Sequence, residues 1–307
     1  MADPGPAPIA LVGTITSDRI SYEGGPAFSG IGGILYQAAV LAGLGDEVRL
    51  VTNVGADAAP EAEKIWAGWP GLRREGVRVV PGAGNRVNLF YPARGERREV
   101  LDSIVPPLEP ERITAAASPD CALVLAALNS GFDIELEDWR RAVDGLACPV
   151  WLDIHSLALD RALGRHRPYV ALPEWRQWAK GVKYLQANRQ EVACMLGDPA
   201  VLPGPGDILK FAGLAFEEGV SAVFVTKGPE GVLVATPSGV GTCAAPAAGR
   251  VVDTTGCGDV FSAGAVHRLV RGASLDEAAN FGVGLAARAV GLSGVRETYD
   301  MARANRT

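Results

Sequence analysis

The chain has 307 residues, of which 48% are hydrophobic and 21% charged, with a formal net charge of −6. This composition predicts a packed globular protein rather than a disordered one. The small acidic excess argues against a nucleic-acid partner, and no apolar run is long enough to imply a membrane partner. The five cysteines are scattered without a CxxC pair, which favours free thiols in a cytoplasmic location.

Short apolar runs alternate with amphipathic segments along almost the whole chain. The runs predict buried strands at residues 9–13, 48–52, 122–126, 150–153, 182–186 and 222–226. The amphipathic segments predict helices at residues 35–42, 60–66, 135–144, 191–196, 208–217, 260–270 and 275–290. This alternation predicts a three-layer α/β/α fold with a mostly parallel central sheet, in which ligands bind beyond the carboxyl ends of the strands.

Two stretches interrupt the alternation. Residues 17–33 are rich in glycine and have little helical periodicity, and residues 86–101 have the pattern of a hairpin with a turn at 92–95. The sequence contains no internal repeat, long linker or low-complexity block. We therefore expect a single domain over residues 1–307, with these two stretches outside the main alternation.

The most informative segment runs from Asp253 through Gly256, Cys257 and Gly258 to Asp259, where a small-residue helix begins. The first turn of a helix has unpaired N–H groups and partial positive charge, so this loop is suited to wrap a phosphate. A carboxylate beside an anion site has a natural role in accepting a proton from a hydroxyl that attacks phosphorus. The alternative is that Asp259 only caps the helix.

Two further loops follow predicted strands. Asn188 and Glu191 have the spacing of a capping box, which by itself accounts for both residues. Thr226, Lys227 and Gly228, with Gly231 three residues on, are also compatible with a simple hairpin turn.

Near the N-terminus, Asp18 comes shortly after the first predicted strand and is either a ligand-binding carboxylate or a turn former. Gly32 and Gly33 permit close approach of the backbone to a ligand, or only a tight turn. His155 follows the strand at 150–153 and is more typical of a hydrogen-bonded loop residue than of a catalyst. Cys257 is a small filler in this interpretation, although a helix N-terminus can also activate a thiol.

Residues 253–264 closely resemble the C-terminal signature of the PfkB (ribokinase-like) carbohydrate kinase family, and weaker resemblance extends from residue 13 to about residue 291. It implies a ribokinase-like fold in which residues 17–33 and 86–101 form a small β lid over the substrate. It also implies that Asp259 is the catalytic base and that the backbone of Gly256, Cys257 and Gly258 forms the anion hole.

The resemblance extends to the other loops. It implies that Glu191, with Asn188, organises the Mg²⁺ that accompanies the nucleotide. Its T-x-G-x-x-G loop, which supports nucleotide phosphates and ribose, corresponds to residues 226–231, where Lys227 adds a phosphate contact. Asn280 falls where the family lines the adenine pocket, although an ordinary helix-face position is the alternative. Asp18, Gly32 and Gly33 correspond to the substrate site.

The sequence departs from the family pattern at two places. The asparagine that contacts sugar hydroxyls is replaced by Tyr36 or Gln37, depending on the alignment, and the asparagine expected after residue 153 is replaced by His155. A tyrosine at the first position is similar to cyclitol-kinase-like members. These differences leave the acceptor open.

We therefore predict an ATP-dependent kinase that uses Mg²⁺ and phosphorylates a hydroxyl of a small sugar or polyol. The family's use of K⁺ near residue 253 and its dimerisation through the lid give two further expectations, a K⁺ requirement and a homodimer. One alternative is a nucleoside kinase of the same fold, for which Tyr22, Phe28, Tyr36 and Phe90 could supply an aromatic wall. Another is a ligand-binding homologue without turnover. Walker and dinucleotide-binding glycine motifs are absent from the sequence, which disfavours P-loop and NAD enzymes.

Overall fold

The computed structural model describes residues 7–25, 27–93 and 97–306. Within these residues, a large sheet has the strand order β14-β13-β12-β11-β10-β9-β1-β4-β5, with β6 paired to β4 beside it. Strands β1, β4, β9, β10, β11 and β12 pair in parallel, whereas β13 and β14 extend the edge as antiparallel strands. The strands of this sheet are β1 (Ile9–Val12), β4 (Val48–Gly55), β5 (Leu72–Arg73), β6 (Val77–Val80), β9 (Leu123–Ala127), β10 (Val150–Asp153), β11 (Tyr184–Asn188), β12 (Ala222–Thr226), β13 (Val232–Thr236) and β14 (Gly239–Cys243).

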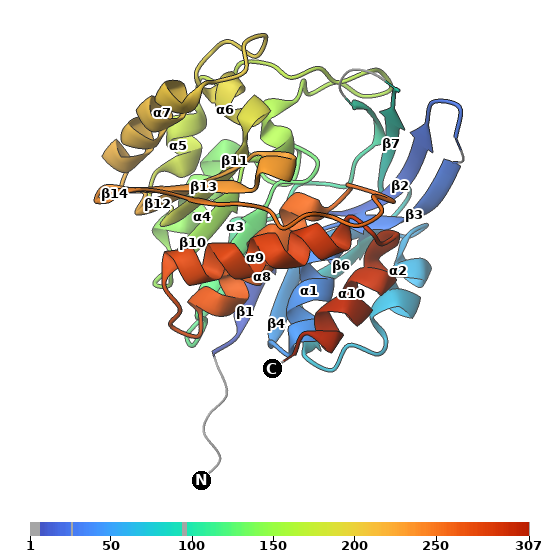
Figure 1. Ribbon diagram of the computed structural model, residues 1–307. Coiled ribbons are helices and arrows are strands. Elements are labelled where there is room, and N and C mark those ends of the chain that lie inside the picture. The colour runs from blue at the N-terminus through green and yellow to red at the C-terminus, as the bar shows by residue number, and fades with distance from the viewer. Residues whose placement is uncertain (1–6, 26, 94–96, 307) are drawn as a thin grey trace.

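Helices cover both faces of this sheet (Figure 1). One face carries α1 (Leu35–Leu44), α2 (Ala59–Trp66), α8 (Cys257–Leu269), α9 (Leu275–Ala289) and α10 (Gly294–Ala304). The other carries α3 (Pro110–Ala117), α4 (Leu136–Asp144), α5 (Trp175–Ala179), α6 (Arg189–Met195) and α7 (Pro205–Glu217). Short 3₁₀ turns, η1 (His155–Ala158) and η2 (Gly228–Glu230), follow β10 and β12. The predicted three-layer α/β/α fold is confirmed.

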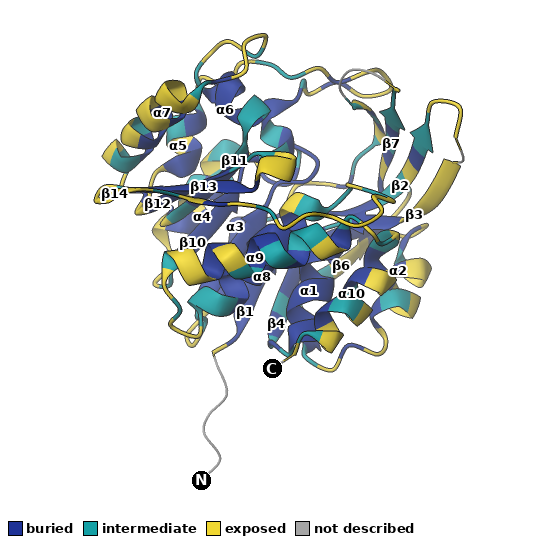
Figure 2. Cartoon of the chain, viewed as in Figure 1, coloured by how far each residue is buried: buried dark blue, intermediate teal, exposed yellow. Residues whose placement is uncertain are grey.

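Successive side chains along the central strands point to opposite faces of the sheet and so contribute to two apolar layers. Ile9 and Leu11 of β1 belong to the core cluster on one face, and Ala10 and Val12 belong to the cluster on the other. Because both faces are covered, these strands are apolar throughout rather than alternately polar. Figure 2 shows the strands of the main sheet as mostly buried.

A second sheet has the order β3-β2-β7-β8 and stands beside the main sheet (Figure 1). Its strands are β2 (Ile15–Tyr22), β3 (Ala27–Gly33), β7 (Asn85–Tyr91) and β8 (Arg98–Ser103), so both stretches that interrupt the sequence pattern are in this sheet. The expected turn at 92–95 lies partly outside the described residues, since 94 and 95 are not described. Among the described residues, no helix is both long and apolar enough to cross a membrane.

Candidate active site

Asp259 lies in the first turn of α8, with a side chain only 6% exposed. Burial raises the pKa of this carboxyl group to about 7, because the charged form loses its hydration. Asp18 adds to the rise, whereas Gln37 and Arg97 oppose it. The amide nitrogen Nε2 of Gln37 donates to Oδ1 of Asp259 at 2.5 Å. A carboxylate with this pKa is suited to accept a proton near neutral pH.

The loop before α8 takes its shape from Gly256. This residue has a φ of +79°, a left-handed conformation, and a Cβ there would lie 2.7 Å from the ring of Tyr36. Because α8 begins at Cys257, the amides of its first turn have no intrahelical acceptors, although the Cys257 N–H donates to the Thr254 carbonyl at 3.3 Å. Burial raises the pKa of the Cys257 thiol to about 12, which argues against a thiolate nucleophile.

A cavity of about 50 Å³ lies beside Asp259, and we call it the acceptor cavity. Its lining residues are Thr16, Asp18, Gly33, Tyr36, Val87, Leu89, Arg97, Glu99, Asn129, His155, Thr255, Gly256 and Asp259. The paired glycines are required here, since a Cβ on Gly32 would lie 2.0 Å from Oδ2 of Asp18 and Gly33 has a φ of +63°. The structure therefore brings the predicted N-terminal residues to the predicted C-terminal loop.

The two positions at which the alignment was ambiguous have different surroundings. Tyr36 lines the acceptor cavity, whereas Gln37 contacts the carboxylate of Asp259. Of the four aromatic residues considered for a nucleoside-binding wall, Tyr36 is the one that lines this cavity, and Phe28 is 47% exposed on β3.

Two polar residues line the acceptor cavity at the carboxyl ends of β9 and β10. Asn129 is 5% exposed, and neither atom of its side-chain amide has a hydrogen-bond partner among the described residues. Burial lowers the pKa of His155 to about 3, so the imidazole is neutral, and its Nδ1 lies 2.9 Å from Oγ of Ser156. Asn129 belongs to none of the sequence motifs, although its place just after a predicted strand was a signal.

An apolar pocket of about 400 Å³, here called the donor pocket, lies between η2 and helices α8 and α9. The predicted residues Thr226, Gly228 and Gly231 line it, together with Cys257 and Gly258. Its apolar wall consists of Val232, Ala245, Pro246, Ala247, Ala248, Val251, Phe261, Val283, Ala286, Ala287 and Val290. Asn280 is not one of its lining residues, because it lies earlier in α9 and its amide donates to the Asp276 carbonyl at 2.9 Å.

A larger cleft of about 790 Å³ borders both sites, and we call it the outer cleft. It shares Thr226 and Gly228 with the donor pocket and Arg97 with the acceptor cavity. Arg189 and Lys227 also line it, so an anion that reaches Asp259 through this cleft passes several positive charges. The motifs did not indicate Arg97, which immediately precedes β8.

The predicted capping box at the start of α6 is present. The backbone and side-chain nitrogens of Asn188 donate to the two carboxylate oxygens of Glu191 at 2.7 and 2.6 Å, and the Glu191 N–H donates back to Asn188 Oδ1 at 2.9 Å. Burial raises the pKa of Glu191, since the carboxylate is only 6% exposed. A nearby cation would favour its charged form.

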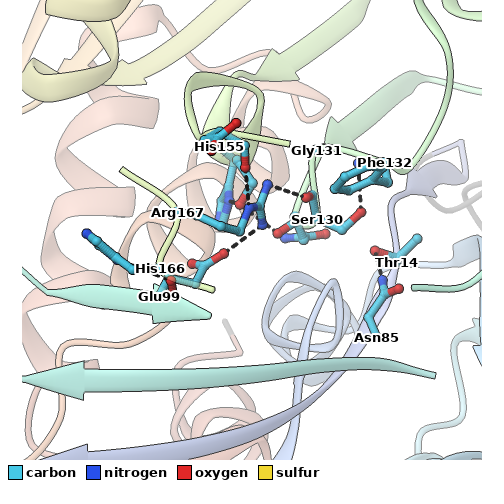
Figure 3. A network of polar contacts seen from close by, with 12 residues as sticks. Thr14, Asn85, Glu99, Ser130, Gly131, Phe132, His155, His166 and Arg167 are labelled. Carbon is cyan, nitrogen blue, oxygen red and sulfur yellow. Dashed lines mark hydrogen bonds and ion pairs between the residues drawn. The ribbon is translucent and has the colours of Figure 1, made fainter. Parts of the chain in front are cut away.

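A buried ion pair includes Glu99, one of the residues that line the acceptor cavity (Figure 3). Nη1 of Arg167 donates to Oε1 of Glu99 at 2.9 Å, and Nη2 donates to the Ser130 carbonyl at 2.8 Å. The Arg167 side chain is 0% exposed and that of Glu99 is 6% exposed. This pair links β8 of the smaller sheet to the loop that follows β9.

Comparisons with known proteins bear on the fold and on the class of protein. The family model "pfkB family carbohydrate kinase" matches residues 158–301. An Archaeoglobus fulgidus protein named as an uncharacterized sugar kinase is 29% identical over 84% of this chain and 96% of its own length. Arabidopsis thaliana ribokinase complexed with ribose and ATP is 19% identical, with a TM-score of 0.72 and 95% of each chain covered. A pyrophosphate-dependent kinase in the ribokinase family, complexed with a pyrophosphate analog and myo-inositol, is 16% identical, with a TM-score of 0.74, 95% of this chain and 98% of that chain covered.

The α/β/α fold and the family match define a kinase of the ribokinase fold. Residues 158–301 of the chain match the PfkB family of carbohydrate kinases, and a sugar kinase homologue is similar over most of the chain.

Proposed function

We propose that this protein transfers a phosphoryl group from ATP to a hydroxyl of a small sugar or polyol. The observation that carries the proposal is the place of Asp259, a buried carboxylate at the start of α8 that lines the acceptor cavity together with Asp18 and Gly256. The acceptor hydroxyl gives its proton to the Asp259 carboxylate as its oxygen bonds to the γ-phosphorus. The bond from that phosphorus to the bridging oxygen breaks, and ADP leaves.

The loop at residues 253–258, here called the anion loop, stabilises the negative charge that develops on the transferred phosphoryl group. The N–H groups of Gly256, Cys257 and Gly258 are the proposed donors, and the positive end of the α8 dipole adds to their effect. Thr226, Gly228 and Gly231 border the route from the donor pocket, and Lys227 provides a phosphate contact from the outer cleft. The apolar donor pocket suits a purine base better than an inorganic donor.

The acceptor cavity favours a small polyol or sugar over a nucleoside. Carboxylate, amide and imidazole groups line it, and these groups suit the hydroxyls of a polyol better than the apolar face of a base. Asp18 accepts hydrogen bonds from acceptor hydroxyls, with Gly32 and Gly33 leaving space for the ligand and Tyr36 forming one wall. The myo-inositol complex of a structural neighbour supports a cyclitol as one acceptor to test.

The residues of the NxxE motif fit a Mg²⁺ ion held mainly through phosphate and water. Across the described part of the chain, no three His, Cys, Asp or Glu side chains gather as a ready metal cage. Both oxygens of Glu191 already accept hydrogen bonds from Asn188, so this carboxylate is placed to orient metal-bound water. Bound Mg²⁺ neutralises phosphate charge.

Three further features belong to the same proposal. The smaller sheet acts as a lid that excludes water from the transfer, within a single kinase domain. Two copies pair through this lid, and K⁺ activates the enzyme near the loop at residue 253.

Asn280 stays a predicted adenine contact that the donor-pocket lining does not support.

The test is ADP release with Mg²⁺–ATP and K⁺ against sugars, cyclitols and nucleosides, with pyrophosphate as a second donor. Asp259→Asn is the control variant, and a positioned base contributes about 10²–10⁴-fold. We expect turnover with one class of small polyhydroxylated acceptor and loss of at least about 100-fold in the variant. Normal turnover in Asp259→Asn would overturn the mechanism. ATP binding without turnover on any acceptor would favour the non-catalytic alternative.

A further inference from the structure

Among the described residues, Gln37 is the side chain that donates a hydrogen bond to the Asp259 carboxylate, and it comes from a distant part of the chain. It lies in the first turn of α1, all of whose residues are buried, and its own side chain is 0% exposed. Nε2 donates to Oδ1 of Asp259 at 2.5 Å. Because both side chains are buried, the contact is shielded from bulk water, and the amide fixes one oxygen of the carboxylate.

The charges around Asp259 make such a donor useful. A buried carboxylate is already disfavoured in its charged form, and acidic neighbours disfavour it further. The charged or titratable groups that face it from packed elements are Asp18 of β2, Tyr36 of α1, Asp153 of β10, Glu191 of α6, Cys257 of α8 and Arg97 ahead of β8. Arg97 is the one cation in this set. A neutral amide donor stabilises the ionised carboxylate without adding a charge that would compete for phosphate.

Packing alone does not explain why a glutamine occupies position 37. Its Oε1 atom is buried and has no hydrogen-bond partner among the described residues. A buried acceptor left without a partner destabilises the folded state, and an apolar side chain of similar size would avoid this. Residues that break a packing rule without local compensation tend to occur at functional sites.

We propose that Gln37 is a positioning residue that keeps the Asp259 carboxylate ionised and directed at the acceptor hydroxyl. This inference rests on the proposed role of Asp259 as the base. The sequence departs from the family pattern at Tyr36 or Gln37. The proposal assigns a role to Gln37, and the neighbouring Tyr36 forms a wall of the acceptor cavity.

The experiment compares Gln37→Leu and Gln37→Glu with wild type by the pH dependence of kcat/KM and by thermal unfolding. We expect the acid limb of the profile to move to higher pH in Gln37→Leu, and further in Gln37→Glu, which adds a like charge. Loss of one hydrogen bond to a charged group corresponds to about a tenfold fall in kcat/KM at pH 6. Below about pH 6, where the Asp259 carboxyl group is mostly protonated, the Tm of Gln37→Leu should equal or exceed that of wild type, because the hydrogen bond to the charged carboxylate is then absent from both proteins.

Val40→Ala is the matched control, because Val40 is a fully buried residue of the same helix. It should lower Tm and leave the acid limb in place. An acid limb that stays in place in an active Gln37→Leu enzyme would overturn the proposal, as would failure of both Gln37 variants to fold. The Asp259→Asn variant distinguishes failure of the proposed base from failure of the Gln37 proposal. If it keeps wild-type turnover, Asp259 is not the base, whatever the Gln37 variants do.

Discussion

The rings of Tyr22 and Tyr91 stack with their centroids 5.0 Å apart and an angle of 18° between their planes. They are register partners on the parallel strands β2 and β7. Each hydroxyl reaches the anion loop, since Tyr22 donates to Oδ1 of Asp253 at 3.1 Å and the Tyr91 hydroxyl lies 2.9 Å from Oγ1 of Thr255. Two strands of the smaller sheet are thus fastened to the loop that leads to Asp259.

If the smaller sheet acts as the proposed lid, removing these hydroxyls should loosen it. We expect Tyr22→Phe and Tyr91→Phe each to lose a hydrogen bond worth about 1 kcal/mol in the closed state, because the stacked rings remain. Acceptor KM should rise several-fold, and ADP release without acceptor should increase as water enters the site. Steady-state assays with and without acceptor measure both effects. Tyr299→Phe is the control, since that ring stacks on Trp69 away from the site, and equal behaviour of all three variants would contradict the prediction.

Arg97 is the cation shared by the acceptor cavity and the outer cleft. Its Nη2 lies 3.3 Å from Oε2 of Glu99, and its charge opposes the raised pKa of Asp259. We predict that Arg97→Met lowers kcat by about 10²–10³-fold, the usual loss when a group that stabilises transition-state charge is removed. Acceptor KM should change much less than kcat.

Arg165→Gln is the control for this prediction, because Arg165 is 72% exposed and pairs with Asp160. It removes one positive charge nearby and should leave both constants unchanged. A large rise in acceptor KM at constant kcat in Arg97→Met would show instead that Arg97 binds the acceptor in its ground state.

The features that the sequence predicted are local ones. The strand and helix alternation identified the main sheet, and the loop ending at Asp259 was recognisable because its residues are consecutive. The contacts between Gln37 and Asp259 and between Tyr91 and Thr255 join residues far apart in the chain, so no spacing could reveal them. Short edge strands such as β5 were also missed, since two residues carry no periodicity.

Removing one partner of the buried pair of Arg167 and Glu99 should lower the free energy of unfolding more than replacing both partners with apolar residues. Removing one partner of a buried ion pair costs about 3–5 kcal/mol when the other charge is left without compensation. Arg97 still lies 3.3 Å from Glu99 and offsets part of its charge, so we expect Arg167→Met to lower the free energy of unfolding by less than that amount in urea titrations. The double variant Arg167→Met with Glu99→Leu should recover part of the loss, whereas strictly additive losses would contradict a buried-charge explanation.

The raised pKa of Asp259 also predicts how stability depends on pH. The folded-state pKa is about 7 and the ordinary value is 3.8, so the folded protein binds the proton more tightly than the unfolded chain. The stability that this group contributes is fully present below about pH 4 and is lost as pH rises through about 7. The amide that Asp259→Asn introduces does not titrate, and its oxygen can still accept the hydrogen bond from Gln37.

We therefore expect Asp259→Asn to be more stable than wild type at pH 8, and the difference to shrink as pH falls toward 4. Since each pKa unit between the two states is worth about 1.4 kcal/mol, the gain at pH 8 is on the order of a few kcal/mol. Thermal unfolding of both proteins between pH 4 and about 8 measures it. Asp300→Asn is the control, because its carboxylate is 64% exposed. A stability difference that is constant across this range would show that burial does not disfavour the charged form of Asp259.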